Sequence, residues 1–415
     1  MTAQAPVLDL DITGIAHGGT FIARHEGRVV FVPDAIPGER VRARIVDPSL
    51  RLADARSVQA SGSGADTRSF WRAETLEVLD PSPHRRPHVW AEADVSRAPE
   101  DRVGGADLGH IALDEQRVFK RRVLQEALDK FAGAGLSAPE VRSVDDGDGT
   151  RWRTRISLHV DAEGRIGPYA ARSHRVIDVA SLPLARAAVE QAAFALRAQK
   201  PGRVDLVESG DERVHVLPRP EGGRRGRSET IVERVAGRRF RLDAGGFWQV
   251  HPRAGETLHA AVADALAGRV DPDATHFDLY GGVGLFAATL GEQGATDIVT
   301  VESDRRATEY AAENLADLDA QAVTARVDRF LAGLPEGTRA GAVVLDPPRA
   351  GAGRAVVESI HGVDPEAVVY VACDPVALAR DLGTFRGLGW DVSSLRAFDL
   401  FPHSHHFEAV AVLTR

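Results

Sequence analysis

The pattern of apolar and polar positions changes character along the chain. From Val7 to about Ala60, short alternating segments are broken by glycine and proline, which predicts the strands of a small β-barrel. Between Asp114 and Gly133, apolar residues recur at helical spacing and predict one amphipathic helix. Strand-like segments return between residues 151 and 241, around one helix near residues 184–197, so a second β-rich module is expected there.

From Thr275 onward, strand-like apolar runs alternate with helical segments. Such alternation predicts an α/β fold, in which a parallel sheet is covered by helices on both faces, as in Rossmann-like domains. No helical segment separates the last two strands, so these two are expected to pair antiparallel. The predicted strands cover residues 275–280, 297–302, 341–346, 367–373, 390–398 and 409–414.

These patterns predict three modules along the chain. The barrel takes residues 1–60, the β-rich module residues 68–240, and the Rossmann-like module residues 241–415. A stretch rich in glycine and serine, residues 61–67, is expected to link the first two modules. The helix at 114–133 is expected to pack against the third.

Cysteine content and hydropathy exclude several classes of protein. Cys373 is the single cysteine in 415 residues, which excludes an intramolecular disulfide framework and any zinc or iron–sulfur site built from several cysteines. No stretch approaches the roughly 20 apolar residues that a membrane-spanning helix needs, and the N-terminus shows no targeting pattern. We therefore expect a cytoplasmic protein without membrane contact, with a monomer as the default state.

The charge distribution is more informative than the total. A net charge of -9 argues on average against nucleic-acid binding, but arginines are clustered ahead of the α/β module. Such clusters indicate a basic face for RNA, with ordinary solvated arginines as the alternative. The clusters lie at residues 85–86, 151–155, 172–175, 224–227 and 238–241.

A glycine-rich turn follows the first strand of the α/β module, in the stretch Asp278-Leu-Tyr-Gly-Gly-Val-Gly284. Glycines at such a turn allow the backbone to approach an adenosyl ligand closely. Glu302 ends the next strand, where a carboxylate can accept both ribose hydroxyls. Together, the turn and the acid indicate a site for an adenosine nucleotide. Gly282, Gly284 and Ala287 also satisfy the dinucleotide fingerprint, so a nicotinamide-dependent enzyme remains an alternative hypothesis.

Cys373 follows the apolar run 367–371 and precedes Pro375 and a helical segment. A thiol at this strand end lies where open α/β sheets bind ligands, and the positive end of the helix dipole favours its thiolate form. A small buried hydrophobic side chain is the alternative. One strand earlier, Asp346-Pro-Pro-Arg349 stands at the corresponding strand end and resembles the substrate-side motif of class I methyltransferases.

Four elements in order carry a closer resemblance: Phe247-Trp-Gln-Val250, Asp346-Pro-Pro-Arg349, Cys373-Asp-Pro375 and Phe401-Pro-His-Ser-His-His-Phe-Glu408. Together they resemble the RNA 5-methyluridine methyltransferase family over most of the chain. The turn at residues 33–39 adds a weaker likeness to the TRAM domain, an OB-like RNA-binding barrel.

The resemblance implies an S-adenosylmethionine-dependent enzyme. Uracil C5 is a poor nucleophile, so the Cys373 thiolate adds to C6 and makes C5 enolate-like, C5 takes the methyl group, and Glu408 removes the C5 proton. The remaining carried-over residues hold the cofactor: Gln249, Tyr280, Gly282, Gly284, Glu302, Asp328 for the adenine, and Asp346 between the methionine moiety and the base.

The chain departs from the family where many members bind an iron–sulfur cluster. The counterpart of the Cys-Gly-Gly-Cys element is Val103-Gly-Gly-Ala106, and Leu182 stands at the later cysteine position. We therefore expect no cluster, and the segment Pro87 to His110 is expected to be held by ordinary packing or to be mobile. His403, His405 and His406 belong to the matched family motif, so no metal site is expected.

The expected substrate is RNA, with a uridine in ribosomal RNA preferred over transfer RNA because the N-terminal barrel accompanies the ribosomal enzymes. Three other hypotheses remain. RNA cytosine-C5 methyltransferases generally use two cysteines, and a nicotinamide oxidoreductase has no evident use for the Asp346 and Cys373 motifs. A catalytically inactive RNA-binding protein is the third, and it would show no methyl transfer on any RNA.

Overall fold

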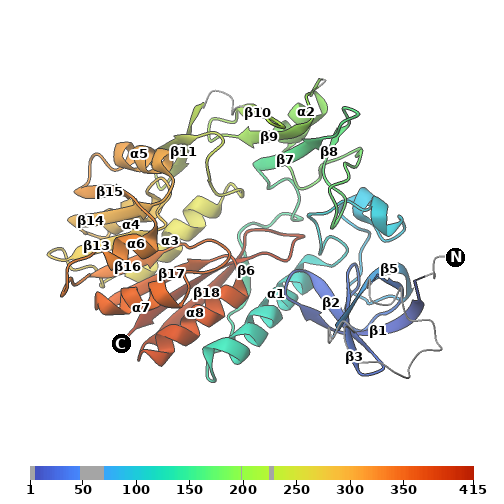
Figure 1. Cartoon of the computed structure of the whole chain (residues 1–415), viewed down its shortest axis with the longest axis horizontal. Helices are drawn as coiled ribbons and strands as arrows, with labels where there is room; N and C mark the ends of the chain where they lie inside the picture. Colours follow the sequence, from blue (N-terminus) through green and yellow to red (C-terminus); the bar gives the residue numbers. More distant parts are fainter. Residues whose placement is uncertain (1–4, 47–69, 198, 224–228) are drawn as a thin grey trace, which may run out of the picture. The chain divides into compact units, whose positions relative to one another are not determined.

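The computed structural model describes residues 5–46, 70–197, 199–223 and 229–415 (Figure 1). The contacts divide the chain into two compact units rather than along the three expected modules. The first unit holds residues 1–119, 165–183 and 402–405, and the second holds residues 120–164, 184–401 and 406–415. The predicted linker at 61–67 lies outside the described residues. No helix in the described ranges has the length and apolar character of a membrane span.

The first unit contains a closed five-stranded barrel, as the sequence predicted, with strand order β1-β2-β3-β5-β4. The barrel does not end at residue 60, because β5 pairs in parallel with β3 and antiparallel with β4 and so closes it. The predicted module boundary is therefore too early. The strands are β1 (Val7–Ala16), β2 (Thr20–His25), β3 (Arg28–Val32), β4 (Arg40–Ile45) and β5 (Phe70–Asp80).

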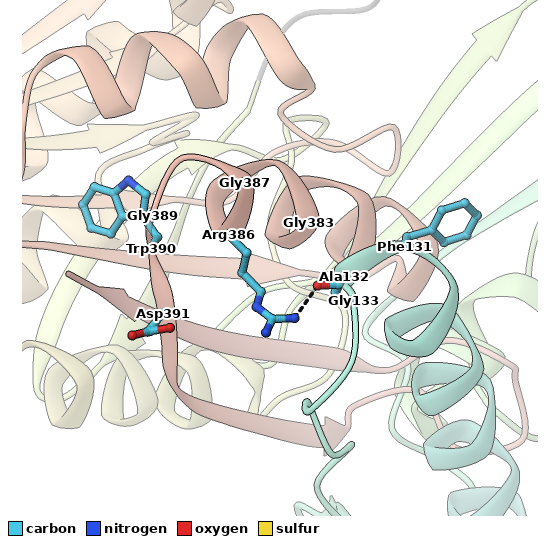
Figure 2. A pocket seen from close by; sticks show the side chains of 9 residues that line it. All are labelled: Phe131, Ala132, Gly133, Gly383, Arg386, Gly387, Gly389, Trp390 and Asp391. Carbon is cyan, nitrogen blue, oxygen red and sulfur yellow. Dashed lines mark hydrogen bonds between the residues drawn. The ribbon is translucent and has the colours of Figure 1, made fainter.

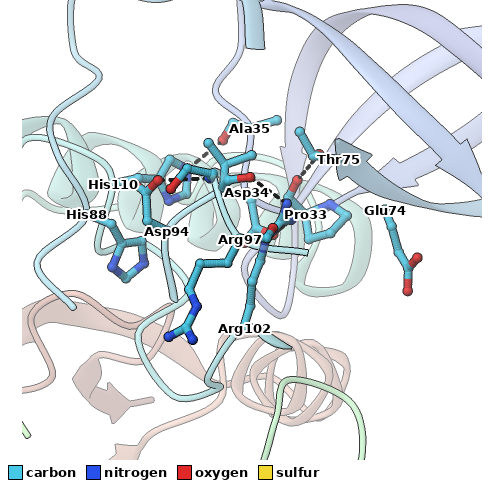
Figure 3. Close-up of polar contacts among 12 residues, drawn as sticks. Pro33, Asp34, Ala35, Glu74, Thr75, His88, Asp94, Arg97, Arg102 and His110 are labelled. Atoms are coloured by element: carbon cyan, nitrogen blue, oxygen red, sulfur yellow. Dashed lines mark hydrogen bonds and ion pairs between the residues drawn. The ribbon is translucent and has the colours of Figure 1, made fainter. Parts of the chain in front are cut away.

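The segment Pro87 to His110, also in the first unit, is tied down by buried polar contacts (Figure 3). Arg102 is 2% exposed; its Nη1 donates to Asp34 Oδ2 at 2.8 Å and its Nε to the Arg97 carbonyl at 3.0 Å. The rings of His88 and His110 stack at 6.0 Å. Of the two expectations for this segment, packing and mobility, the structure supports packing. Its short elements are η2 (Ala91–Ala93) and η3 (Pro99–Asp101), and β8 (Ile166–Gly167) lies in the same unit.

The predicted amphipathic helix is present as α1 (Leu113–Ala127), which continues as the single-turn π-helix η4 (Leu128–Ala132). Gly133, with φ 85°, ends it because only glycine adopts such a φ at low cost. From Lys120 onward the helix belongs to the second unit, where Leu124 and Leu128 enter the core of the large sheet. A pocket of about 490 Å³ lies beside η4, where Arg386 Nη1 donates to the Ala132 carbonyl (Figure 2).

The central part of the second unit is β-rich, as predicted. β9 pairs antiparallel with both β7 and β10, and β11 and β12 form a hairpin. Several of the clustered arginines pair with carboxylates here, including Arg151 with Glu190, and the cluster at 224–227 lies outside the described residues. The elements are β6 (Val141–Ser143), β7 (Arg155–Val160), α2 (Ala187–Phe194), β9 (Gly202–Glu208), β10 (Val214–Pro220), β11 (Thr230–Val235) and β12 (Arg238–Asp243).

An eight-stranded sheet, ordered β15-β14-β13-β16-β17-β19-β18-β6, organises the second unit. β15, β14, β13, β16 and β17 are parallel, and β19 pairs antiparallel with β17 and β18, which confirms the predicted fold class and the antiparallel final pair. The strands are β13 (Thr275–Leu279), β14 (Asp297–Glu302), β15 (Ala320–Thr324), β16 (Ala342–Leu345), β17 (Ala367–Ala372), β18 (Asp391–Asp399) and β19 (Glu408–Thr414).

Helices cover both faces of this sheet, because its central strands are apolar on both sides. In β16, Val343 and Leu345 enter the core with one set of helices, while Ala342 and Val344 enter the core with the other. The helices are α3 (Ala254–Leu266), α4 (Leu285–Glu292), α5 (Arg305–Asn314), α6 (Val327–Ala332), α7 (Arg354–Gly362) and α8 (Pro375–Gly387). Because the strands from β13 to β17 run parallel, their carboxyl ends lie along one edge of the sheet, and the loops that follow them gather there.

Candidate active site

The strand register places Cys373 opposite Glu408. Ala372, the last residue of β17, pairs with Ala409, and β19 runs antiparallel from Glu408. Cys373 directly follows β17, and Glu408 directly precedes Ala409 on β19, so the register carried one position further brings these two residues together. Directly opposed residues on antiparallel strands have Cα atoms about 5 Å apart. The two residues to which the sequence assigned nucleophile and base lie side by side.

Cys373 is half-buried and directly precedes the capped N-terminus of α8. Asp374 Oδ1 accepts hydrogen bonds from the backbone N–H groups of Val376 and Ala377, at 3.0 and 2.8 Å. From the sequence, this helix end is expected to favour a thiolate. Instead, burial raises the pKa of Cys373 to about 12, Glu408 adds to the rise, and Arg349 opposes it. Burial and the nearby acids both disfavour the charged thiolate, so the protonated thiol is favoured in the free protein.

Glu408 is 5% exposed, and its Oε2 atom has no hydrogen-bond partner among the described residues. Burial raises the pKa of this carboxyl well above its usual range; the charge of Asp346 adds to the rise and Arg349 opposes it. A carboxyl group of this kind is a stronger base than an exposed glutamate, since its neutral form is favoured. An unsatisfied buried carboxyl is also a site at which a bound molecule can place a proton donor.

Two further acids, the fully buried Asp278 and the half-buried Asp346, lie at the ends of β13 and β16. Asp278 is fully buried; its Oδ2 accepts from Thr300 Oγ1 at 2.8 Å and from the Ala287 N–H at 3.1 Å, while its Oδ1 has no partner among the described residues. Burial raises the pKa of Asp278 to about 7. Burial also raises the pKa of Asp346 to about 7, and Asp278 adds to that rise. Asp278 was not chosen from the sequence, although it opens the glycine-rich stretch.

The glycine-rich turn leaves β13 through left-handed backbone. Tyr280 has φ 62°, an uncommon value for a residue with a side chain, and Gly282 and Gly284 have φ 56° and 92°. A Cβ atom on Gly281 would lie 2.0 Å from Thr300 Oγ1, so no larger residue fits there, whereas one on Gly282 would meet nothing within 4 Å. The turn is tightly packed on its inner side and open at Gly282.

Glu302 ends β14 beside this turn, and its Oε2 accepts from the Gly282 N–H at 3.3 Å. Asp328 lies on α6 and is exposed, in an ion pair with Arg326 at 2.9 Å. Burial raises the pKa of Tyr280 to about 12, with the charge of Asp328 as the next contribution, so Asp328 lies near the tyrosine. The structure thus brings Tyr280, Gly282, Glu302 and Asp328 to one end of the sheet.

Gln249 is half-buried. Hydrogen bonds from Thr154 and from Arg155, the first residue of β7, hold the segment that carries it. Thr154 Oγ1 donates to the Val250 carbonyl at 2.9 Å, and Arg155 Nη1 donates to the Gly246 carbonyl at 2.8 Å. Arg155 belongs to one of the arginine clusters predicted to form a basic face for RNA, but its guanidinium contacts the protein backbone. Phe247, within the same segment, is 77% exposed.

Two of the motif histidines, His403 and His405, contact side chains of the first unit. In the first unit, the His403 N–H donates to Gln116 Oε1 at 2.8 Å, and His405 Nδ1 lies 2.5 Å from Asp107 Oδ2. The described ranges contain no group of three or more histidine, cysteine or acidic side chains arranged to hold a metal ion.

The residues around the turn fit S-adenosylmethionine. The unpartnered Oδ1 of Asp278 is a buried acceptor suited to a cationic amino group, and the Glu302 carboxylate at its strand end suits a pair of hydroxyls. The open space at Gly282 admits a ligand against the backbone.

Comparison with known proteins agrees with this geometry. Residues 6–58 match the model of the TRAM domain, and residues 336–415 match the model of the tRNA (uracil-5-)-methyltransferase family. An RNA methyltransferase of Streptomyces avermitilis is 37% identical over 98% of this chain and 97% of its own length. A Shewanella sediminis protein named as a 23S rRNA (uracil(1939)-C(5))-methyltransferase is 26% identical over 97% of this chain and 95% of its own length.

Among solved structures, the tRNA (uracil-54, C5)-methyltransferase of Pyrococcus abyssi in complex with S-adenosyl-L-homocysteine matches with a TM-score of 0.70. The match covers 98% of this chain and 99% of that one, at 20% identity. At this identity the likeness shows a shared fold.

Proposed function

The chain belongs to the S-adenosylmethionine-dependent RNA (uracil-C5)-methyltransferases, and from that premise we propose that it methylates a uridine of ribosomal RNA through a covalent bond between Cys373 and C6. The observation that carries the proposal is the register that pairs Ala372 with Ala409, because it sets the only thiol of the chain beside a buried carboxyl. The nucleophile and the proton-accepting residue must act on the same uracil ring. Neighbouring positions on adjacent strands bring the two side chains close enough to do so.

Cys373 is the nucleophile. Its thiol proton passes to water as Sγ bonds to C6, and the electron pair of the C5=C6 bond moves onto C5 and the C4 carbonyl oxygen. S-adenosylmethionine, when bound, supplies the methyl group for C5. The half-buried position of Cys373 requires the target uridine to leave its base stack and enter the protein.

Glu408 is the base that completes the reaction. It accepts the C5 proton, the C5=C6 bond re-forms, and the C6–Sγ bond breaks to release the enzyme. Because the site raises the pKa of Glu408 above the usual carboxyl range, the proton transfer is better matched than to an exposed glutamate. Asp346 lies near enough to raise that pKa further, which supports its placement between base and cofactor.

Cofactor binding falls to the residues around the glycine-rich turn. Glu302 is assigned to the ribose hydroxyls, Tyr280 and Asp328 to the adenine side, and Asp346 to the methionine side. Gly282 and Gly284 shape the backbone against which the ligand rests, and Gln249 approaches from the segment fixed by Thr154.

Two similarities support ribosomal RNA as the proposed substrate. Residues 6–58 match the TRAM domain, and the Shewanella sediminis relative, which is named as a 23S rRNA methyltransferase, is similar over 97% of this chain. The solved transfer RNA enzyme shares the fold at lower identity and does not argue for its own substrate here.

The experiment uses ribosomal and transfer RNA transcripts carrying tritium at uridine C5. The proposal predicts that each methyl group transferred releases one tritium to water, from ribosomal RNA in preference to transfer RNA. Release only from RNA labelled at cytidine C5 would support the cytosine methyltransferase hypothesis. Binding of both RNAs without methyl transfer would support the inactive RNA-binding protein.

A further inference from the structure

The loop that carries Asp346 and Arg349 is anchored from behind by two buried residues. This loop runs from the end of β16 to Gly353, the residue before α7. The Ala352 N–H donates to Asp381 Oδ2 at 2.8 Å and lies 3.1 Å from the Tyr370 hydroxyl. The Gly353 N–H donates to the same Asp381 oxygen at 3.2 Å, and so does the Tyr370 hydroxyl, at 2.6 Å.

This anchor is dry and closely fitted. Tyr370 is 0% exposed and Asp381 is 4% exposed. A Cβ atom at Gly351, whose φ is 83°, would lie 2.7 Å from Asp381 Oδ2, so the loop can approach the carboxylate this closely only with glycine there. A buried carboxylate oxygen that accepts three hydrogen bonds holds its donors firmly, because each would be costly to leave unsatisfied.

The same two elements also hold the nucleophile. Tyr370 lies on β17, three positions before Cys373, and Asp381 lies on α8, the helix that begins directly after Asp374. The loop is therefore fastened to the strand and the helix that flank the thiol. The anchor therefore fixes Ala352 and Gly353, at the C-terminal end of this loop, to the two elements that flank the thiol.

Arg349 is an exposed cation on this loop, and its charge acts on the site. It opposes the rise in the pKa values of both Cys373 and Glu408, and it lowers the pKa of Arg153, which burial has already depressed. Its influence on the thiol depends on where the loop holds it, since Coulomb interactions change steeply at short range.

We propose that Tyr370 and Asp381 are positioning residues that hold the loop from Asp346 to Gly353, and with it Arg349, against the thiol of Cys373. This role rests on the proposed function of Cys373 but is tested without RNA or cofactor. Neither residue touches the reacting atoms; both act through the loop.

Cys373 is the only cysteine, so the loss of free thiol during treatment with iodoacetamide reports the alkylation of this residue alone. At pH 8.5 the alkylation rate follows the thiolate fraction, and a rise of one pKa unit lowers it about tenfold. The variants are Asp381→Asn, Arg349→Gln and the double variant. Glu358→Gln, an exposed carboxylate on the neighbouring α7, is the matched control.

We expect Asp381→Asn and Arg349→Gln each to slow alkylation about fivefold. In the Arg349→Gln background, Asp381→Asn should change the rate by less than about twofold, because no cation is left to position. A direct electrostatic effect would have the opposite sign, since removing a nearby carboxylate favours the thiolate. Faster alkylation, an unchanged rate, or two effects that add in the double variant would each overturn the proposal.

Tyr370→Phe provides a second route if Asp381→Asn does not fold. It keeps the aromatic ring in the core and removes only the hydroxyl that contacts Asp381 and Ala352, so a smaller fall in the alkylation rate is expected. If the thiol responds as expected while no RNA is methylated, the positioning role stands and the proposed function fails.

Discussion

Two kinds of buried charge stand out among the described residues of the second unit, and they differ in whether the charge has a partner. At the end of β18, Lys120 Nζ lies 2.6 Å from Asp399 Oδ1, and the two side chains are 1% and 2% exposed. Lys120 also donates to the Phe401 carbonyl. At the carboxyl edge of the sheet, Asp278 and Glu408 are as deeply buried, yet each has a carboxyl oxygen without a partner among the described residues.

The Lys120–Asp399 pair suits a structural role, whereas the acids without a partner at the sheet edge suit proton transfer. A buried pair is satisfied within the fold, so its pKa values are of little use for proton transfer. A buried acid without a cation partner is destabilising in its charged form, and its pKa moves toward neutrality, where proton transfer is efficient.

The largest effect is expected from Glu408→Gln. Without the base, the C5 proton stays in place after methylation, so kcat should fall about 10²–10⁴-fold while the Cys373–C6 bond still forms. Gel analysis of denatured enzyme with unmodified RNA should therefore show an adduct that accumulates in Glu408→Gln. A variant that keeps full turnover would remove Glu408 from the mechanism.

Breaking the structural pair should affect stability instead. Lys120→Met leaves Asp399 buried and unpaired and should lower the free energy of unfolding by about 3–5 kcal/mol, measured by urea denaturation. Arg122→Met, on the same helix, breaks the exposed pair with Glu126 and should cost less than about 1 kcal/mol. Equal losses in the two variants would contradict the comparison.

Asp278→Asn should have a smaller effect, of opposite sign. The folded pKa of Asp278, about 7, lies above its unfolded value, so the wild-type protein binds more protons when folded and loses stability as pH rises from about 4 to 7. The variant escapes that loss and should be more stable by about 1–3 kcal/mol at pH 8, with no gain near pH 4. Weaker S-adenosylmethionine binding should accompany the gain; thermal unfolding at both pH values and calorimetric titration provide the test.

The mildest test perturbs nothing but pH. Because burial raises the pKa of Cys373 to about 12, the thiolate fraction should grow about tenfold per unit between pH 7 and 10. The rate of iodoacetamide alkylation should rise with that slope and show no plateau. A plateau below pH 9 would mean that the helix dipole and Arg349 outweigh burial.

The elements easiest to predict were those with local signals. The β-branched run before Cys373 and the glycines after Asp278 predicted β17, β13 and the turn between strand and helix. The segment Ala320–Thr324 is short and has a single β-branched apolar residue, Val323, so β15 was missed. β5 was missed because it closes the barrel from beyond residues 47–69, and pairing at that separation leaves no local pattern.

The candidate site, too, was predictable from the sequence only where a local motif marks the residue. Motif order pointed to Cys373 and Glu408, but their side-by-side placement depends on the register of β17 against β19. Asp381 looked like an ordinary polar position of an amphipathic helix, and Arg155 like a surface arginine. Their contacts with the backbone at Ala352 and Gly246 are set by packing between distant segments, which the sequence alone does not specify.

The central claim is that Cys373 forms a covalent bond to C6 of a uridine in RNA. The measurement that tests it most directly is incubation of the enzyme with S-adenosylmethionine and RNA containing 5-fluorouridine, followed by denaturing electrophoresis. Fluorine at C5 cannot be removed as a proton, so the wild-type enzyme should be trapped on the RNA while Cys373→Ala should not. An adduct that persists in Cys373→Ala, or none with wild-type enzyme that binds the cofactor, would contradict the account.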